Sequence, residues 1–359
     1  MKLRILAAAA VILPGLCGHA LAWGYQGHEL VGSIAEHLLG KHAKQQVNEI
    51  LGYKPLRGGS HGGFTLRDAG PWPDCVKSVK PEAGAFQPEP GSFAYIPDVL
   101  EYRIPCTPFE NPQEEARMAN YVARNWNNCK VNGKPADNCH SMYHYADVSV
   151  AHDHYDRTYE GTSDHDIVHA INAAIDVLEG MPTPAPFSIR DKKEALFLLV
   201  HFVGDIHQPL HVGAIYLDAQ GKPVNPDARG ADGTALNTAG GNDLADEQTK
   251  LHTEWDAIPL KFGTSASPEM IGAAKAVPPT AGPIGGFAAS WASDTIKQAQ
   301  IAYAGLTFTP DKHFDPKKPK WWVHFKEADA YRDKERALKR AQLAKAGARL
   351  AQLLNAIWP

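Results

Sequence analysis

The chain has 359 residues, 44% of them apolar, and carries a formal net charge of −4. This length allows one large domain or two ordinary ones, and the apolar fraction is sufficient for a sizeable core. The negative charge argues against a protein that binds nucleic acid through a broad basic face, so a polyanionic ligand would need positive charge from another source. Metal ions can supply that charge, and the 17 histidines are compatible with them. Histidines scattered over the surface would explain the same composition.

The N-terminus has the features of an export signal. Two basic side chains in the first four residues precede an apolar run over residues 5–16, which is too short to span a bilayer. Residues 20–22 (Ala-Leu-Ala) then match the small-x-small pattern after which signal peptidase cuts. We therefore predict that residues 1–22 are removed and that Trp23 becomes the first residue. Loss of the two basic residues would change the net charge from −4 to −6 (−4 − 2).

Cleavage at this point implies a protein that is secreted or located in a periplasm, with no membrane anchor after cleavage. An uncleaved anchor is the alternative, and the short apolar run together with the cleavage pattern disfavours it. No other segment is long and apolar enough to cross a membrane.

Four cysteines remain after cleavage, and an even number in an exported chain predicts two disulfides. Three pairings are possible from sequence. We favour Cys75 with Cys106 and Cys129 with Cys139, because both pairs close short loops. Cysteine as a zinc ligand is the weaker alternative, because none of the four has a C-x-x-C partner.

Apolar side chains recur at helical spacing in four segments, which we predict to be helices: residues 28–39, 164–179, 190–207 and 329–358. Ser163 is the expected N-cap of the second helix, and Pro209 is expected to stop or kink the chain after the third. No segment shows a convincing strand pattern. Stretches rich in Gly and Pro predict long loops over residues 54–112, 218–242 and 277–287.

These patterns predict an all-α fold, a single large helical domain over residues 23–359 with long decorating loops. One domain is favoured over two because the candidate ligands described below are spread from residue 23 to residue 256. A single site assembled from such distant segments needs one core to hold them together.

The sharpest local pattern joins His201, Asp205 and His211 as H-x(3)-D-x(5)-H with a proline inside. On a helix, His201 and Asp205 share a face because they are four residues apart. Pro209 redirects the chain, so that His211 can turn back toward the same pocket. Imidazole and carboxylate ligands without thiolate suit zinc in a catalytic rather than a structural site. A buried His beside an Asp is commonplace, but the complete run is much more specific.

Four further motifs contain candidate ligands. They are W-x(4)-H ending at His28, W-P-D ending at Asp74, H-Y-A-D from His144 to Asp147, and H-x(3)-D from His252 to Asp256. The last repeats the i, i+4 geometry on another predicted helix. Each of the first three motifs, taken alone, is more typical of ordinary structure than of a metal site. Their order along the chain is what indicates such a site.

That order resembles the S1/P1 nuclease family of secreted zinc enzymes. It reads W-x(4)-H, W-x-D, H-Y-x-D, H-x(3)-D-x(5)-H, G-G-N and H-x(3)-D, and it extends from Trp23 to Asp256. The segments HFVGDIHQPLHVG and LHTEWD are its most specific parts. The resemblance implies the phospholipase C/P1 nuclease fold and a hydrolase that acts on phosphoric ester bonds.

The resemblance also implies three zinc ions, and no expected ligand type is substituted. The three ligand sets would be Asp74, His144, His201 and Asp205; Trp23, His28 and the other oxygen of Asp205; and His211, His252 and Asp256. Trp23 would bind through its free α-amino group and its carbonyl oxygen. An amine can ligate only when processing has freed it and when it is deprotonated, so export would precede metal loading.

The mechanism implied is attack on phosphorus by a hydroxide held between two bridged zincs near Asp74 and Asp205, with no protein nucleophile. The third zinc would bind phosphate oxygens and stabilise the departing 3′-oxygen, which gives 5′-phosphorylated nucleotides. Tyr145 would stack on a base, Asp147 would accept hydrogen bonds from its edge, and Asn242 would line the cleft. The alternatives are a core aromatic at Tyr145 and a plain turn at Asn242. We expect a monomer that hydrolyses single-stranded DNA and RNA, with 3′-nucleotidase activity left open.

The spacing departs from that of the compact fungal members of the family. The chain is longer between Asp74 and His144, and also between His211 and His252. The first insertion holds three of the four cysteines, so the family's disulfide pattern cannot be transferred. We expect both insertions to lie near the cleft. Three further histidines are expected to support or pack rather than to bind metal: His152, His154 and His207.

The nearest alternative is a zinc phospholipase C, a family that by resemblance shares the fold and the trinuclear site. Three residues favour the nuclease: Asp256 where the phospholipases have Glu, Phe202 where they have Tyr, and Ala214 where they have Asn. A non-catalytic zinc-binding protein is the second alternative. Such proteins would use His-rich flexible tracts, whereas the candidate ligands here are dispersed and alternate with carboxylates.

Overall fold

The computed structural model describes residues 23–77, 79–82, 85–88, 106–131, 133–228, 235–247, 249–311 and 320–359. The predicted signal peptide, residues 1–22, lies outside the described residues. Among the described residues, no helix is both long and apolar enough to cross a membrane.

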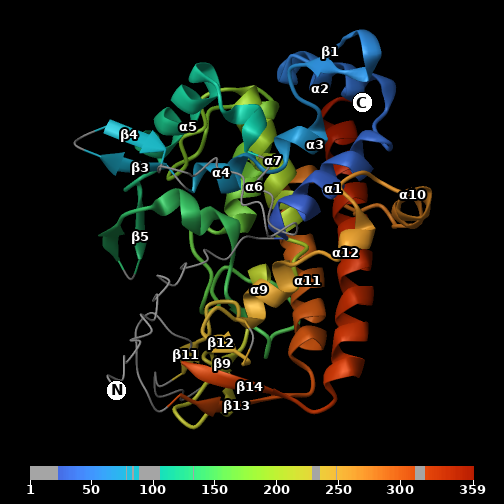
Figure 1. Cartoon of the computed structure of the whole chain (residues 1–359). Helices are drawn as coiled ribbons and strands as arrows, with labels where there is room; N and C mark the ends of the chain where they lie inside the picture. The colour runs from blue at the N-terminus through green and yellow to red at the C-terminus, as the bar shows by residue number, and fades with distance from the viewer. Residues whose placement is uncertain are drawn as a thin grey trace, which may run out of the picture.

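Helices dominate the described chain, as predicted (Figure 1). The α-helices are α1 (Gly24–Glu36), α2 (Lys41–Leu51), α3 (Leu66–Ala69), α4 (Trp72–Val76), α5 (Pro112–Arg124), α6 (Ile167–Leu178), α7 (Lys192–Asp205), α8 (Pro209–Val212), α9 (Leu251–Asp256), α10 (Pro268–Lys275), α11 (Phe287–Tyr303) and α12 (Ala328–Ile357). The short 3₁₀ helices are η1 (Arg57–Gly59), η3 (Thr107–Phe109), η4 (Cys139–His144), η5 (Leu260–Phe262) and η6 (Ile284–Gly286).

The four predicted helices are present as α1, α6, α7 and α12, but α1 begins four residues earlier than predicted, at Gly24, and ends at Glu36, and the start of α6 also differs. The prediction that Ser163 caps the second helix is wrong, because the carboxylate of Asp166 accepts the backbone N–H groups of Val168 and His169. The Ser163 hydroxyl accepts the N–H of His165 in the turn before the helix. Pro209 ends the third segment as predicted, since it opens the separate helix α8.

Short strands correct the prediction that the chain contains none. They are β1 (Lys54–Pro55), β2 (His61–Gly62), β3 (Val79–Glu82), β4 (Ala85–Pro88), β5 (Cys129–Val131), β6 (Lys134–Ala136), β7 (Val148–Ser149), β8 (Gly213–Ala214), β9 (Tyr216–Leu217), β10 (Pro223–Val224), β11 (Leu236–Asn237), β12 (Leu244–Ala245), β13 (Leu306–Pro310) and β14 (Trp321–Phe325). None of these exceeds five residues. The alternation of apolar and polar residues that predicts a strand is hard to recognise over so short a segment. Small two- and three-stranded sheets result, and the largest pairing is the β13–β14 hairpin.

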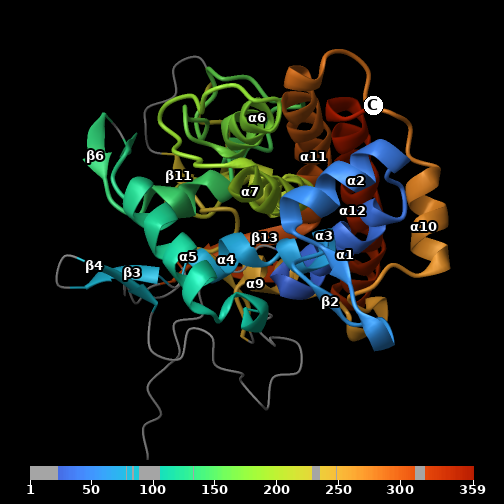
Figure 2. The ribbon, with the colours of Figure 1, turned by 90° about the horizontal axis from the view of Figure 1, so that it is seen from above.

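The main core is built around α1, α7 and α12, which lie against one another (Figures 1 and 2). Gly347 of α12 permits the close approach of α1, because a Cβ at this position would lie 2.5 Å from Cβ of Ile34. Both α1 and α7 carry candidate ligands. These ligands therefore project from helices that the core holds rigidly.

A second hydrophobic cluster lies below α9. Leu251 and Trp255 of α9 pack there with Tyr303 at the end of α11 and with Phe308 and Val323 of the β13–β14 hairpin. This cluster holds the short helix that carries the last two candidate ligands.

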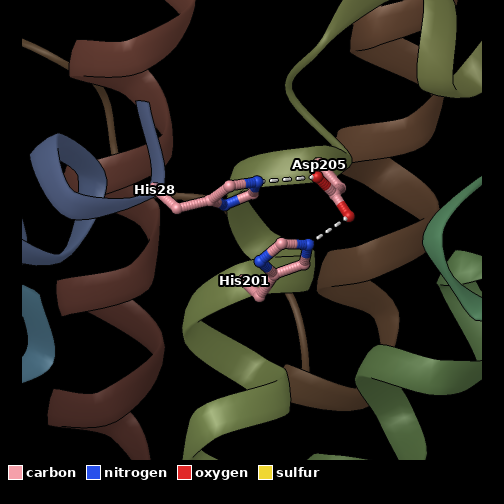
Figure 3. Close-up of side chains that lie close together, drawn as sticks. All are labelled: His28, His201 and Asp205. Carbon is pink, nitrogen blue, oxygen red and sulfur yellow. Dashed lines mark ion pairs between the residues drawn. The ribbon is translucent and has the colours of Figure 1, made fainter. Parts of the chain in front are cut away.

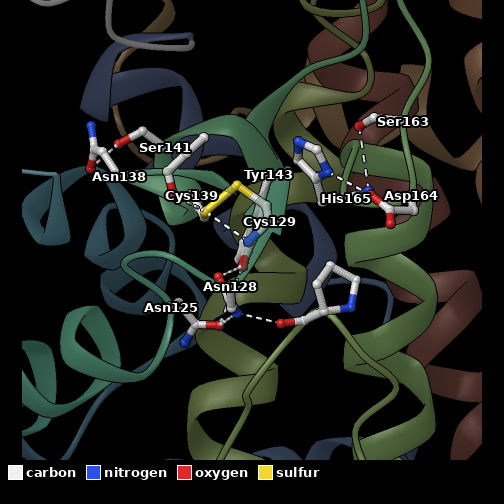
Figure 4. Close-up of a disulfide and its surroundings, with 12 residues drawn as sticks. Asn125, Asn128, Cys129, Asn138, Cys139, Ser141, Tyr143, Ser163, Asp164 and His165 are labelled. Atoms are coloured by element: carbon white, nitrogen blue, oxygen red, sulfur yellow. Dashed lines mark hydrogen bonds and ion pairs between the residues drawn. A yellow bond between two sulfur atoms is a disulfide. The ribbon is translucent and has the colours of Figure 1, made fainter. Parts of the chain in front are cut away.

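Both favoured disulfides are present. Cys75 of α4 is bonded to Cys106, and Cys129 of β5 is bonded to Cys139 at the start of η4 (Figure 4). The two bonds tie the predicted insertion to α4 and η4, the elements that carry Asp74 and His144.

Candidate metal centre and substrate pocket

Helix α7 supplies His201 and Asp205, and both side chains are fully buried. The helix begins at Asp191, whose carboxylate caps it by accepting the N–H of Glu194. The four-residue spacing places Nε2 of His201 3.1 Å from Oδ2 of Asp205. The predicted pairing on one helix face is therefore confirmed.

A first group of potential ligands forms where α1 meets α7 (Figure 3). His28 from α1 lies with Nε2 3.2 Å from Oδ1 of Asp205, and its ring stacks on that of His201 with 3.6 Å between centroids. Gly204 makes room for this imidazole, because a Cβ there would lie 2.7 Å from Nδ1 of His28. The three side chains thus converge from two helices.

Trp23 is anchored next to this group at the N-cap of α1. It is fully buried, and its indole Nε1 donates to the carbonyl oxygen of Gly204 at 2.8 Å. Its φ of 39° lies in the left-handed region, which is uncommon for a residue other than glycine. This hydrogen bond holds the start of α1 against Gly204 of α7, the residue that precedes Asp205.

The second group joins Asp74 of α4, His144 at the end of η4, and His201. Nδ1 of His144 lies 2.9 Å from Oδ2 of Asp205, and Nε2 of His201 lies 3.6 Å from Oδ1 of Asp74. Nδ1 of His201 donates to the carbonyl oxygen of Gly70 at 2.7 Å, because a carbonyl can only accept. This bond fixes the tautomer and leaves Nε2 of His201 with a lone pair directed at the carboxylates.

The third group consists of His211 from α8 with His252 and Asp256 from α9. Nε2 of His252 lies 3.3 Å from Oδ2 of Asp256. Gln208 orients that carboxylate by donating from Nε2 to Oδ1 at 2.8 Å, while its own Oε1 accepts the N–H of Leu210. Gln208 lies in the turn between α7 and α8. It therefore helps to position Asp256, through its amide nitrogen, and the helix that carries His211, through its amide oxygen.

The two histidines of the third group face each other in a way that favours a bound cation. Nδ1 of His211 donates to the carbonyl oxygen of His144 at 2.8 Å, and Nδ1 of His252 donates to that of Gly240 at 2.6 Å. Their Nε2 atoms lie 3.2 Å apart. Each ring hydrogen is on Nδ1, so both Nε2 atoms present lone pairs, which repel at this distance unless a cation binds them. Metal-ligating histidines typically donate their other ring N–H in this manner.

Burial and neighbouring charges shift the pKa values of several candidate ligands. Burial lowers the pKa of His28, with a further contribution from His201, and burial together with neighbouring His211 lowers the pKa of His252 to about 3.

Burial alone would raise the pKa of Asp205, but the surrounding histidines, His201 first, hold it well below its usual range. Asp256 differs from Asp205, because burial raises its pKa well above the usual range despite the hydrogen bond from Gln208. Neutral imidazoles and ionised carboxylates are the forms that bind metal.

Three carboxylate oxygens of the candidate ligands lack hydrogen-bond donors. Oδ2 of Asp74, Oδ1 of Asp205 and Oδ2 of Asp256 are buried and accept no hydrogen bond from the described residues. Buried polar atoms are normally paired, so each exception needs a partner of another kind. In Asp205, Oδ1 lies next to His28, while Oδ2 lies next to His144 and His201. One carboxylate thus offers an oxygen to each of the first two groups.

A pocket of about 370 Å³ opens beside the third group. His211 and His252 contribute to its lining, and so do the three predicted substrate residues, Tyr145, Asp147 and Asn242. The Tyr145 side chain is 39% exposed, which places it outside the core. The predicted base-binding residues therefore lie together, next to candidate ligands.

Comparison with known proteins gives one family. The model of the S1/P1 nucleases matches residues 23–359. The chain belongs to the S1/P1 nuclease family. No curated protein sequence matches it. The family assignment makes the protein a hydrolase that acts on phosphodiester bonds, supports the nuclease over the phospholipase alternative, and agrees with the helical fold.

The family is zinc-dependent, and the three His/Asp groups of this nuclease could hold metal ions. The donor set fits zinc, because it combines imidazole nitrogens with carboxylate oxygens and contains no thiolate. The histidines expected to remain outside the groups do so. Nδ1 of His207 donates to the carbonyl oxygen of Val203 and Nε2 accepts from Arg349, while Nε2 of His152 contacts Asp227.

Sequence reasoning missed Lys77, which lies at the edge of the second group. Its Nζ is 2.8 Å from Oδ1 of Asp74, and the residue lines the pocket. Its charge also contributes, after burial, to the lowered pKa of His144. Lys77 is three residues after Asp74, but this spacing places two side chains together only on a helix, and the sequence predicted a loop over residues 54–112 where the structure has α4. This nuclease therefore has a cation of its own at the candidate centre.

Sequence reasoning also missed Lys339 of α12, which holds the ligand helix α9 in place. Its Nζ donates to the carbonyl oxygens of Glu254 and Ala257 at 2.6 and 2.8 Å, and lies 2.5 Å from Oε1 of Glu335. A cation at the C-terminus of a helix satisfies its last carbonyls and complements its dipole. No local pattern could reveal a contact between segments about eighty residues apart.

Proposed function

We propose that this nuclease is an exported, zinc-dependent endonuclease that hydrolyses single-stranded DNA and RNA to 5′-phosphorylated nucleotides. The observation that carries the proposal is the pair of facing Nε2 atoms of His211 and His252, whose ring hydrogens are both on Nδ1. This arrangement needs a cation, and it lies in a pocket together with an exposed aromatic ring.

The residues that would bind zinc are those predicted from the sequence. We assign Asp74, His144, His201 and Asp205 to one ion, Trp23, His28 and Asp205 to a second, and His211, His252 and Asp256 to a third. The two oxygens of Asp205, each directed at a different group, support its role as a bridge. Zinc bound there would lower the pKa of a water near Asp74 and Asp205 and would neutralise charge on the phosphate.

The protein's own residues would orient the substrate. Tyr145 presents an exposed ring on which an unpaired base can stack, which favours single strands and tolerates every base. Asp147 would accept hydrogen bonds from the base edge, and Asn237 already holds its Oδ2 at 2.9 Å. Lys77, on the same pocket, would counter the negative charge that builds on the phosphate as the 3′-oxygen leaves. Asn242 would complete the wall.

Export matters for metal binding because Trp23 is one of the assigned ligands. We propose that removal of residues 1–22 frees the α-amino group that completes the second ligand set, and that the mature enzyme acts as a monomer in a periplasm or outside the cell. Two disulfides support an oxidising location.

The experiment is a chelation and rescue assay on the purified mature protein. Removal of metal should abolish hydrolysis of single-stranded DNA and RNA, zinc should restore it, and the products should carry 5′-phosphates. Phosphatidylcholine and a 3′-nucleotide, offered in parallel, test the phospholipase alternative and 3′-nucleotidase activity. His252→Asn should lose at least about 100-fold in rate, whereas His154→Asn, which alters an exposed histidine paired with Asp153, should not. Unchanged activity after complete chelation would refute the proposal.

A further inference from the structure

Residues 206–208, which we call the ligand turn, join helix α7 to helix α8 and have candidate ligands on both sides. Asp205, the last residue of α7, offers one oxygen to each of the first two metal groups, whereas His211 on α8 belongs to the third. Gln208, within the ligand turn, holds Asp256 of the third group. The position of this turn therefore sets where the third group lies relative to the other two.

Two buried side chains from other helices hold the backbone of the ligand turn. The hydroxyl of Thr295 on α11 donates to the carbonyl oxygen of Ile206 at 2.7 Å, and Nε2 of Gln342 on α12 donates to that of His207 at 2.9 Å. Both donor residues are buried. Buried carbonyl oxygens are normally paired, and outside a regular helix the donor has to come from elsewhere in the fold. The two hydrogen bonds thus tie the ligand turn to α11 and α12.

The imidazole of His207 fixes the ligand turn at a third point. Its Nδ1 donates to the carbonyl oxygen of Val203, four residues earlier on α7, at 2.7 Å, because a carbonyl can only accept. Nε2 therefore accepts, and Nη1 of Arg349 on α12 donates to it at 3.0 Å. Arg349 is held in turn by Asp294 of α11, with Nη2 2.9 Å from Oδ2. The fully buried ring is thus bonded at both nitrogens.

The end of α7 is held independently of the ligand turn. It is bonded to the start of α1 through the indole of Trp23 and the carbonyl oxygen of Gly204, and the helix packs in the main core. Loss of a contact to the ligand turn should therefore leave Asp205 in place and affect the residues that follow it. The first candidate ligand among these is His211, so we expect the third metal group to respond rather than the first two.

We propose that Thr295, Gln342 and Arg349 are positioning residues, which hold the ligand turn and thereby set the zinc affinity of the third group. They act through the backbone of the turn and the ring of His207. This inference rests on the proposed zinc-dependent function. It gives a part in that function to α11 and α12, the two long helices that carry none of the candidate ligands.

The test measures zinc binding by the metal-free mature protein in competition with a chromophoric chelator. Gln342→Met keeps the length of the side chain and removes its amide. We expect the zinc affinity of one site to fall about tenfold, the lower end of the range for residues that support a metal ligand, and that of the other two to stay unchanged. In a His252→Asn background, which lacks a ligand of the third group, Gln342→Met should weaken zinc binding no further. This comparison identifies the affected site.

Gln352→Met is the matched control for Gln342→Met. Gln352 is on the same helix and makes the same kind of contact, because its Nε2 donates to the carbonyl oxygen of Thr280 at 2.8 Å, in a loop without candidate ligands. Both variants should lower the melting temperature of the metal-free protein, but only Gln342→Met should weaken zinc binding. A loss of stability alone would therefore not explain the result.

A second pair of variants tests the contact from α11. Thr295→Val removes only the hydroxyl and should weaken the same zinc site, whereas Thr183→Val, which removes a hydroxyl bonded to the carbonyl oxygen of Ile189, should not. Equal weakening of all three sites, or losses no greater than those of the controls, would overturn the positioning role. If the unaltered protein binds no zinc, the proposed function fails instead, so the two failures are distinguishable.

Discussion

Replacing Lys339 by Met tests how the ligand helix α9 is held. Lys339 is 3% exposed and links α12 to the end of α9 through the carbonyl oxygens of Glu254 and Ala257. Its charge is balanced by Glu335, one turn earlier on α12, which is 5% exposed. Methionine matches the length of the lysine stem and removes only the ammonium group.

The structure sets the magnitude. Removing one partner of a buried ion pair costs about 3–5 kcal/mol, because the other charge remains buried and unpaired. This is a large part of the 5–15 kcal/mol that typically stabilises a folded domain. The double variant Glu335→Leu with Lys339→Met should recover most of that loss, since no buried charge remains. It should not recover zinc affinity at His252 and Asp256, which we expect to fall about 10- to 100-fold when the support of α9 is lost.

The assay combines denaturant unfolding with zinc analysis of each variant, with Arg340→Met as the control. Arg340 is next to Lys339 in the chain, and it pairs on the surface with Glu269, so its loss should cost about 1 kcal/mol or less. Burial raises the pKa of Glu335 and Lys339 lowers it, so without Lys339 the carboxyl binds a proton more readily. The penalty for Lys339→Met should therefore be smaller at pH 5 than at pH 7. A loss no greater than that of Arg340→Met, or a double variant no more stable than the single one, would refute this reasoning.

Three further predictions follow from other parts of the molecule. One extra residue before Trp23 should reduce zinc content and activity while the circular dichroism spectrum stays unchanged; full activity would show that its α-amino group is not a ligand. Burial raises the pKa of Asp147 to about 6, opposed by the hydrogen bond from Asn237, so in zinc-free protein its ionisation should destabilise the fold as pH rises through 6. Asp147→Asn should then match the wild type at pH 4 and exceed it by about 2 kcal/mol at pH 7, whereas an equal difference at both values would contradict the assignment. Replacing Cys129 and Cys139 by serine should lower the free energy of unfolding by about 3 kcal/mol, because the loop that their bond closes is opened; an unchanged denaturant midpoint would contradict this.

The candidate metal groups could be predicted because their ligands are strongly patterned. The i, i+4 pairs at His201 and Asp205 and at His252 and Asp256 indicate helix faces, and both pairs lie on helices. The motif order then related His28 and Asp74 to the same site, and the structure brings each into a group of potential ligands.

The supporting residues could not be predicted, because they act across the fold. Lys339 reaches α9 from a helix about eighty residues further along the chain, and its own surroundings in sequence resemble an ordinary charged helix. The left-handed backbone of Asn138 lies directly before the disulfide-bonded Cys139, and no pattern in the sequence marks that conformation. The strands were missed for a related reason, since pairs such as Ala245 with Trp322 join distant segments.

The central claim is that phosphodiester cleavage depends on zinc bound by the three His/Asp groups. The most direct test is a zinc titration of the chelated mature protein, with bound zinc and hydrolysis of a single-stranded oligonucleotide measured on the same samples. We predict no hydrolysis in the zinc-free protein and a rise in rate as the three groups fill. Hydrolysis at the full rate in samples without bound zinc would contradict the account.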